Sequence, residues 1–314
     1  MKLLKSCLLL LLMATPTATF VYGQTAAEKE GESKILTTPD GWPIHINYYA
    51  SSAGKESPVV ILFPGVEGHE NSMTRKVWSG AATALNSKGF AVVTADLRKH
   101  GESVISTGET LDERQLKLGP NDYSLMASSD LETIKTFLLQ EHEAGNLNIR
   151  KLGIATAGSG GLVAAGFAVN DWAKKPWPDA PTLALSTPKG QDVRALFLLS
   201  PKSTVRGLNS TALMKGLADP TKGIAVHLWF NPEIRDERSS AEKLFRFLEL
   251  KDPALAEARK LNEGPPDKDG KFSAEGLLQD KAKPIMEKHI VEFFEKHLKE
   301  LDSPWRSRIS RLQQ

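Results

Sequence analysis

Strand-like apolar runs alternate along the chain with segments in which apolar residues recur at helical spacing. The first two extended segments, residues 35–38 and 44–49, flank a Pro-Asp-Gly turn and predict a β-hairpin. Further strands, most of them continuously apolar as in strands buried on both faces, are predicted at residues 58–63, 90–95, 152–156, 195–199 and 224–230. Helical patterns occur at residues 78–85, 123–139, 161–172, 239–250 and 284–301.

This alternation predicts an α/β fold with a mostly parallel central sheet and helices on both faces. Ser239 and Glu242 predict a capping box at the start of the helix over residues 239–250. The most linker-like stretch, residues 262–271, lies too near the end of the chain to divide two domains. We therefore predict one domain over residues 34–301.

The N-terminal residues have the three parts of a secretory signal peptide. Lys2 and Lys5 precede an apolar run at residues 7–14, and slim residues follow at the positions that a signal peptidase reads. We predict a signal peptide over residues 1–23, a flexible lead-in over residues 24–33, and a secreted or periplasmic location. Because the apolar run is too short to span a bilayer, no stable membrane anchor is expected after cleavage.

Composition excludes several classes of protein. Of the 314 residues, 40% are apolar and 25% are charged, as in ordinary globular proteins and unlike disordered or coiled-coil chains. The signal holds two of the 40 Lys and Arg and no acid, so the rest balances at 38 bases against 38 acids. This balance provides no bulk electrostatic reason to bind nucleic acid or an anionic membrane.

No cofactor or metal is predicted. Cys7 is the only cysteine and leaves with the signal, so the mature chain has neither a disulfide nor a thiol ligand. No histidine or carboxylate spacing indicates a metal site. The glycines at residues 158, 160 and 161 do not form a dinucleotide fingerprint, because several strands precede them.

Three motifs follow the predicted strands in a fixed order. They are LFPGVEG at residues 62–68, DLRKHGES at residues 96–103 and AGSGG at residues 157–161. Together they resemble the oxyanion loop, the D-L-R-G-H-G-x-S signature and the nucleophile elbow of the α/β-hydrolase superfamily. The resemblance covers about residues 35–301 and implies a single α/β-hydrolase domain with an N-terminal hairpin. It also implies a site built from a serine, a histidine, a carboxylate and backbone N–H groups.

The elbow can be aligned in two ways. In one, Ser159 is the nucleophile, and alanine replaces the first glycine of the G-x-S-x-G pattern. In the other, the following GGLVA sequence sets the register, which places Gly158 at the nucleophile position and Ser159 in the first turn of a helix. The predicted oxyanion and pocket residues are Gly65, Val66, Gly68, Gly158 and Gly160.

The other catalytic groups are harder to find. Glu233 and Asp236 lie where the family places its acid, although a charged surface loop is the simpler interpretation of this segment. The family places its histidine before the final helix, but residues 261–284 contain none, and Ser273 or Ala274 occupies that position. His69, beside the oxyanion loop, is the remaining candidate base.

These observations lead to three hypotheses. The first is a catalytically degenerate protein that binds an unknown small molecule or protein partner in the pocket. The alternative is a serine hydrolase, esterase-like or lipase-like, with Ser159 as nucleophile. The third is a structural interaction module. The C-terminal tail, residues 302–314, is predicted to be solvated, and the insertion at residues 174–192 is predicted to be a surface loop or a lid.

Overall fold

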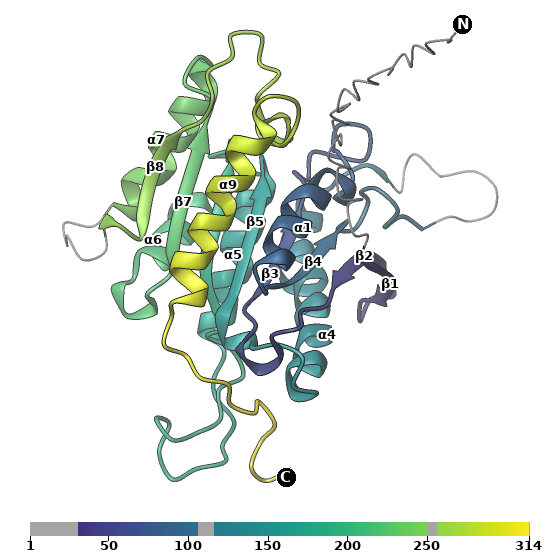
Figure 1. Cartoon of the computed structure of the whole chain (residues 1–314), viewed down its shortest axis with the longest axis vertical. Coiled ribbons are helices and arrows are strands. Elements are labelled where there is room, and N and C mark those ends of the chain that lie inside the picture. Colours follow the sequence, from purple (N-terminus) through teal and green to yellow (C-terminus); the bar gives the residue numbers. More distant parts are fainter. Residues whose placement is uncertain (1–30, 106–115, 250–255, 314) are drawn as a thin grey trace, which may run out of the picture.

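An eight-stranded sheet forms the centre of the protein in a computed structural model that describes residues 31–105, 116–249 and 256–313 (Figure 1). The strands are β1 (Glu32–Thr37), β2 (Pro43–Tyr49), β3 (Val59–Phe63), β4 (Ala91–Ala95), β5 (Leu152–Ala157), β6 (Val193–Leu199), β7 (Ala225–Phe230) and β8 (Arg259–Glu263). Their order is β1-β2-β4-β3-β5-β6-β7-β8. The pairs β1–β2 and β2–β4 are antiparallel and all others are parallel, so the predicted hairpin and mostly parallel sheet are confirmed.

Helices cover both faces of the sheet, as predicted. Helices α1 (Ser79–Ser87) and α9 (Lys283–Phe294) pack on one face (Figure 1). The other face is covered by α4 (Leu131–Glu143), α5 (Gly160–Ala173), α6 (Ser210–Ala218) and α7 (Arg235–Leu248). The apolar runs of the inner strands are buried on both sides because each strand contributes alternate side chains to the two cores.

Shorter helical segments connect these elements. The predicted helix at residues 123–139 consists of α3 (Pro120–Leu125), a π turn at Met126–Asp130 and the start of α4. Another π turn, Glu295–Lys299, extends α9. The 3-10 turns are Gly54–Glu56, Arg75–Trp78, Ile149–Lys151, Pro220–Lys222 and Ala274–Leu278. In the part of the chain described, no helix is long and apolar enough to cross a membrane.

The C-terminal third differs from the prediction in three places. Strand β8 overlaps the segment interpreted as a linker, because its sequence RKLNE is only partly buried at the sheet edge and has no apolar run. Helix α6 was not predicted. Helix α7 begins at Arg235, so the capping box is wrong: Ser239 lies inside the helix.

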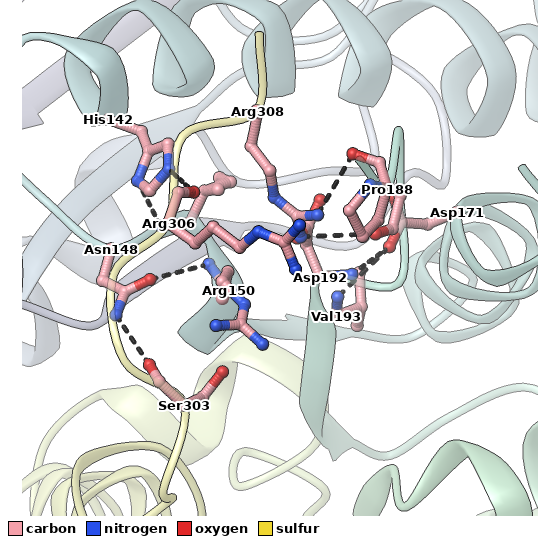
Figure 2. Close-up of polar contacts among 12 residues, drawn as sticks. His142, Asn148, Arg150, Asp171, Pro188, Asp192, Val193, Ser303, Arg306 and Arg308 are labelled. Atoms are coloured by element: carbon pink, nitrogen blue, oxygen red, sulfur yellow. Dashed lines mark hydrogen bonds and ion pairs between the residues drawn. The ribbon is translucent and has the colours of Figure 1, made fainter. Parts of the chain in front are cut away.

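The C-terminal tail packs against the protein, so the prediction of a solvated terminus is wrong (Figure 2). Trp305 donates a hydrogen bond from Nε1 to the carbonyl of His142 (3.0 Å), and its ring packs at a tilt against the His142 ring. Arg308 is buried and forms an ion pair with Asp192. These partners lie far from the tail in sequence, which is why its composition alone did not reveal the contact.

Strand β1 begins at Glu32, two residues before the predicted start of the domain. The predicted signal peptide, residues 1–23, and residues 24–30 of the predicted lead-in lie outside the described residues.

Candidate functional site

The candidate site lies in loops at the carboxyl ends of the parallel strands, where open α/β sheets place their ligands. Gly65 follows β3, Gly158 follows β5, Ser200 follows β6 and Asn231 follows β7. Residues of these loops and of the segment before α9 line a pocket of about 540 Å³. Its charged lining residues are Glu67, Lys202, Asp236, Glu237 and Glu275.

Gly158 occupies the apex of the elbow. It directly follows β5 and has a φ of +52°, in the left-handed region that favours glycine. Ser159 has helical backbone angles (φ −65°, ψ −22°), and α5 begins at the next residue. Of the two registers, the structure therefore has the one that places Ser159 a step beyond the nucleophile position.

Glu67 fills the space in front of this apex. A Cβ atom on Gly158 would lie 2.4 Å from Glu67 Oε1, so a side chain at that position would require the Glu67 carboxylate to move. The backbone N–H of Ser159 donates to Glu67 Oε1 (2.7 Å), and its hydroxyl donates to Glu67 Oε2 (2.9 Å). Lys202 forms an ion pair with the same carboxylate. The serine hydroxyl thus has a carboxylate, and no imidazole, as its hydrogen-bond acceptor.

A second carboxylate, from the segment before α9, bonds to the loop after β3. Glu275 is buried, and its Oε1 accepts a hydrogen bond from the backbone N–H of Gly65. Burial raises the pKa of the Glu275 carboxyl, because a charge is disfavoured away from water. In the hydrolase arrangement, the residue after the nucleophile and the loop after the first buried strand supply the oxyanion donors. Here the N–H groups of Ser159 and Gly65 both donate to carboxyl groups. A negatively charged carboxylate at these donors would repel an oxyanion.

Val66, Gly68 and Gly160, also predicted to line the pocket, contribute to the packing of the core and of the loops. Val66 is buried in the hydrophobic core. Gly68 has a φ of +108° and donates its N–H to His100 Nε2 (3.0 Å), so the DLRKHGES motif holds the loop in place. A Cβ on Gly160 would lie 2.1 Å from the hydroxyl of Thr156, so close packing of α5 on β5 requires glycine there.

Of the two predicted acids one lines the pocket, and a neighbouring carboxylate is more enclosed. Glu233 is exposed and is not among the pocket residues, whereas Asp236 lines the pocket with an exposed side chain. Glu237 is the more enclosed carboxylate: its Oε2 accepts hydrogen bonds from Ser200 Oγ (2.7 Å) and Asn231 N–H (2.9 Å). Glu237 was not predicted as a site residue, because it lies in the first turn of α7 and not in the loop after β7.

Ser273 donates a hydrogen bond from its hydroxyl to Glu237 Oε1. The loop before α9 thus presents a hydroxyl to the acid where the family presents an imidazole. A hydroxyl has no basic nitrogen with which to remove a proton from a nucleophile at neutral pH. The pair of Glu237 and Ser273 therefore joins the loop before α9 to the first turn of α7.

His69 lies in a neighbouring pocket of about 390 Å³, which it lines with Glu67 and Tyr123. Its Nδ1 atom is buried without a hydrogen-bond partner. Within the described ranges no imidazole is hydrogen-bonded to Ser159, whose hydroxyl donates to Glu67. The same ranges contain no group of three or more His, Cys, Asp or Glu residues arranged to hold a metal ion.

Three carboxylates of the site, Glu67, Glu237 and Glu275, were not among the sequence candidates. Glu67 stands inside the LFPGVEG motif and was the only one with a signal, as the sole charged residue of the oxyanion loop. Glu275 lies in the segment before the final helix, where the resemblance predicts a histidine. Their common role emerges only where the loops meet in space.

Several solved structures with a similar fold are esterases. An esterase named LipW from Mycobacterium marinum is 14% identical, with a TM-score of 0.55, over 87% of this chain and 83% of that one. An esterase from Exiguobacterium antarcticum is 12% identical, with a TM-score of 0.51, over 83% of this chain and 99% of that one. A comparison with fungal esterases from Rhizomucor miehei gives 14% identity and a TM-score of 0.52, over 86% and 85%. No family model and no curated protein matches the sequence.

The chain thus has the α/β-hydrolase fold, as its three motifs predicted. At 11–14% identity the likeness to the solved structures concerns this fold. Function must be argued from the site itself, because one fold supports many activities.

Proposed function

We propose that this protein binds a small ligand in the pocket over Gly158 and does not hydrolyse it by serine chemistry. The observation that carries the proposal is the position of Glu67, whose carboxylate takes up the space of a nucleophile side chain and bonds to Ser159 N–H. Without an imidazole to accept its proton, a serine hydroxyl is a weak nucleophile at neutral pH. The occupied N–H groups of Gly65 and Ser159 also support a site without acyl transfer.

The charges of the pocket favour a ligand that carries a positive charge or donates hydrogen bonds. Four carboxylates line it, from Glu67, Asp236, Glu237 and Glu275, against the single ammonium of Lys202. Burial raises the pKa of Glu275, which reduces its share of the negative charge. Asp236 is exposed, and Glu67 keeps a further acceptor site beside its bonds to Ser159 and Lys202, so an organic amine is the ligand class we expect.

A thermal-shift panel tests this proposal. Small amines (putrescine, arginine and choline) are compared with acetate, glutamate and phosphate. We expect amines to raise the melting temperature, and Glu67→Gln to weaken the best amine about tenfold, the factor for loss of one charge-assisted hydrogen bond. Glu233→Gln is the matched control, since Glu233 is exposed and outside the pocket. Equal responses of the two variants, or no response to amines, would contradict an amine site.

A second candidate is an esterase-like serine hydrolase that uses Ser159. The esterases among the structural neighbours favour it, as does the hydrogen bond from the Ser159 hydroxyl to a carboxylate. Labelling with a fluorophosphonate probe separates the candidates. We expect no labelling of the folded wild type, whereas labelling that disappears in Ser159→Ala would establish the hydrolase and reject our first proposal.

We also propose, from the N-terminal residues alone, that the protein is exported. Expression of the complete chain in a bacterial host, followed by fractionation and mass spectrometry, tests the location. The expected product is extracytoplasmic and begins at Gln24. An intact N-terminus on a cytoplasmic product would be the contrary result.

A further inference from the structure

Large apolar side chains gather at the end of the molecule opposite the pocket. Seven large apolar side chains are exposed among the described residues, and four of them lie on two segments, the loop 174–192 and the tail 302–313. They are Leu183 (78% exposed), Leu185 (56%), Ile309 (41%) and Leu312 (77%). We call these two segments together the basal tip.

The two segments form one body. The backbone N–H of Arg311 donates to Asp179 Oδ2 (3.0 Å), and the guanidinium of Arg308 donates to the carbonyls of Pro188 (3.1 Å) and Gly190 (3.3 Å). The ion pair of Arg308 with Asp192 joins the two segments directly before β6 (Figure 2). Figure 1 shows the loop before β6 and the C-terminal segment projecting together beyond the end of the sheet. The exposed apolar side chains therefore lie on two segments that are bonded to each other.

The charges exposed on the basal tip are mostly positive. Two of its three acids are buried: Asp192 is paired with Arg308 and Lys135, and Asp179 accepts backbone hydrogen bonds. Asp302 is the remaining acid and is exposed. The exposed bases are Lys175, Lys189, Arg306 and Arg311. Four positive charges thus face one negative charge, although the whole mature chain is balanced.

We propose that the basal tip binds reversibly to the surface of an anionic lipid bilayer. Leucine and isoleucine side chains can enter the boundary between head groups and acyl chains, while lysine and arginine contact the lipid phosphates. Trp177 is half-buried, and Lys189 Nζ lies 3.7 Å from the centre of its ring. Tryptophan is a side chain that membrane interfaces favour. All five residues of the run Pro181-Thr182-Leu183-Ala184-Leu185 are exposed, so packing in the hydrophobic core does not explain its apolar character.

Charge argues against a second copy of this chain as the occupant. A two-fold dimer through the basal tip would bring two surfaces with the same excess of positive charge together. An anionic bilayer instead offers both acyl chains for the leucines and phosphates for the bases. Bound in this way, the protein would hold its pocket on the side away from the lipid, because the site lies at the opposite ends of the strands.

Vesicle co-sedimentation tests this proposal. The chain from Gln24 onward is used, so that the apolar run of residues 7–14 cannot bind lipid itself; it retains every described residue. We expect binding to phosphatidylcholine vesicles that contain phosphatidylglycerol, weakened by salt, and little binding to phosphatidylcholine alone. Both Leu183→Ser/Leu185→Ser and Lys175→Glu/Lys189→Glu should reduce binding by about tenfold or more.

Ile285→Ser/Lys288→Glu is the matched control, because it changes one exposed apolar and one exposed basic residue on α9, away from the tip. It should bind as the wild type does, and circular dichroism should show all variants folded. Absence of binding, or equal binding to both lipid compositions, would overturn the proposal. So would a concentration-dependent dimer that disappears in the leucine variant, since a second copy would then cover the tip.

Discussion

The Glu67 carboxylate accepts the backbone N–H of Ser159 at 2.7 Å, beside the apex glycine of the elbow. This single contact joins the loop after β3 to the first turn of α5. It uses the N–H that a hydrolase would offer to an oxyanion. A Cβ on the residue before Ser159 would meet the same carboxylate, and the φ of +52° at that residue favours glycine as well.

Gly158→Ser should destabilise the fold without creating an active serine. The new side chain would clash with Glu67 and force a non-glycine residue to a φ of +52°, which together cost about 1–3 kcal/mol. Adding Glu67→Ala removes the clash, so the double variant should recover part of that loss. Urea denaturation of the wild type, both single variants and the double variant measures the coupling. Strictly additive effects would show that Glu67 does not occupy the space of the missing side chain.

Arg308→Met should lower the free energy of unfolding by about 3 kcal/mol, because it removes a partner from the buried Asp192 carboxylate. The remaining pair of Asp192 with Lys135 keeps the loss at the low end for a buried ion pair. Arg306→Met, at an exposed position two residues away, should change stability by less than about 0.5 kcal/mol. Chemical denaturation of the two variants makes the comparison, and equal stability would mean that the tail does not support the fold.

Acid should destabilise the protein through one buried and two half-buried imidazoles. Burial lowers the pKa of His227 and of His297 to about 4, and it lowers the pKa of His142 as well. Because these folded pKa values lie below the unfolded value of about 6.5, the neutral forms stabilise the fold above that pH. This contribution is lost as the pH falls from about 6.5 to about 4.

The variant His227→Phe isolates this effect in denaturation midpoints measured across the same pH range. Its ring can pack on Phe293, which lies 4.5 Å from the His227 ring, and the variant should show a shallower loss of stability in acid. The comparison with wild type also cancels Glu275 and Asp130, whose raised pKa values act in the opposite direction. An unchanged pH dependence in the variant would show that His227 does not titrate with folding.

Much of the fold could be predicted from local sequence. Continuous apolar runs identified β3 to β7, because strands buried on both faces need apolar residues at every position. The polar edge strand β8 was not predicted. It pairs with β7 on one side only and is half-buried, so it does not need a continuous apolar run. Helix α7 was shortened in the prediction because its first turn, RDER, is charged and carries no apolar periodicity.

The candidate site divides in the same way. The missing histidine in residues 261–284 could be read directly, as could the two possible registers of the elbow. Only the structure shows that Gly158 is the apex of the elbow. It also shows that Glu67 accepts the N–H of Ser159 and that Glu275 accepts the N–H of Gly65. Residues 67, 159 and 275 are distant in sequence, and no local pattern encodes a contact between their loops.

The amino-acid sequence by itself determined the class of fold, because burial of alternating strands and helices leaves a periodic record in neighbouring residues. Tertiary structure alone decided which carboxylates stand at the elbow and that the C-terminal tail is anchored through Arg308. Hydrogen bonds and ion pairs act over a few ångströms in space, whatever the separation along the chain. Their partners therefore become known only once the sheet has brought its loops together.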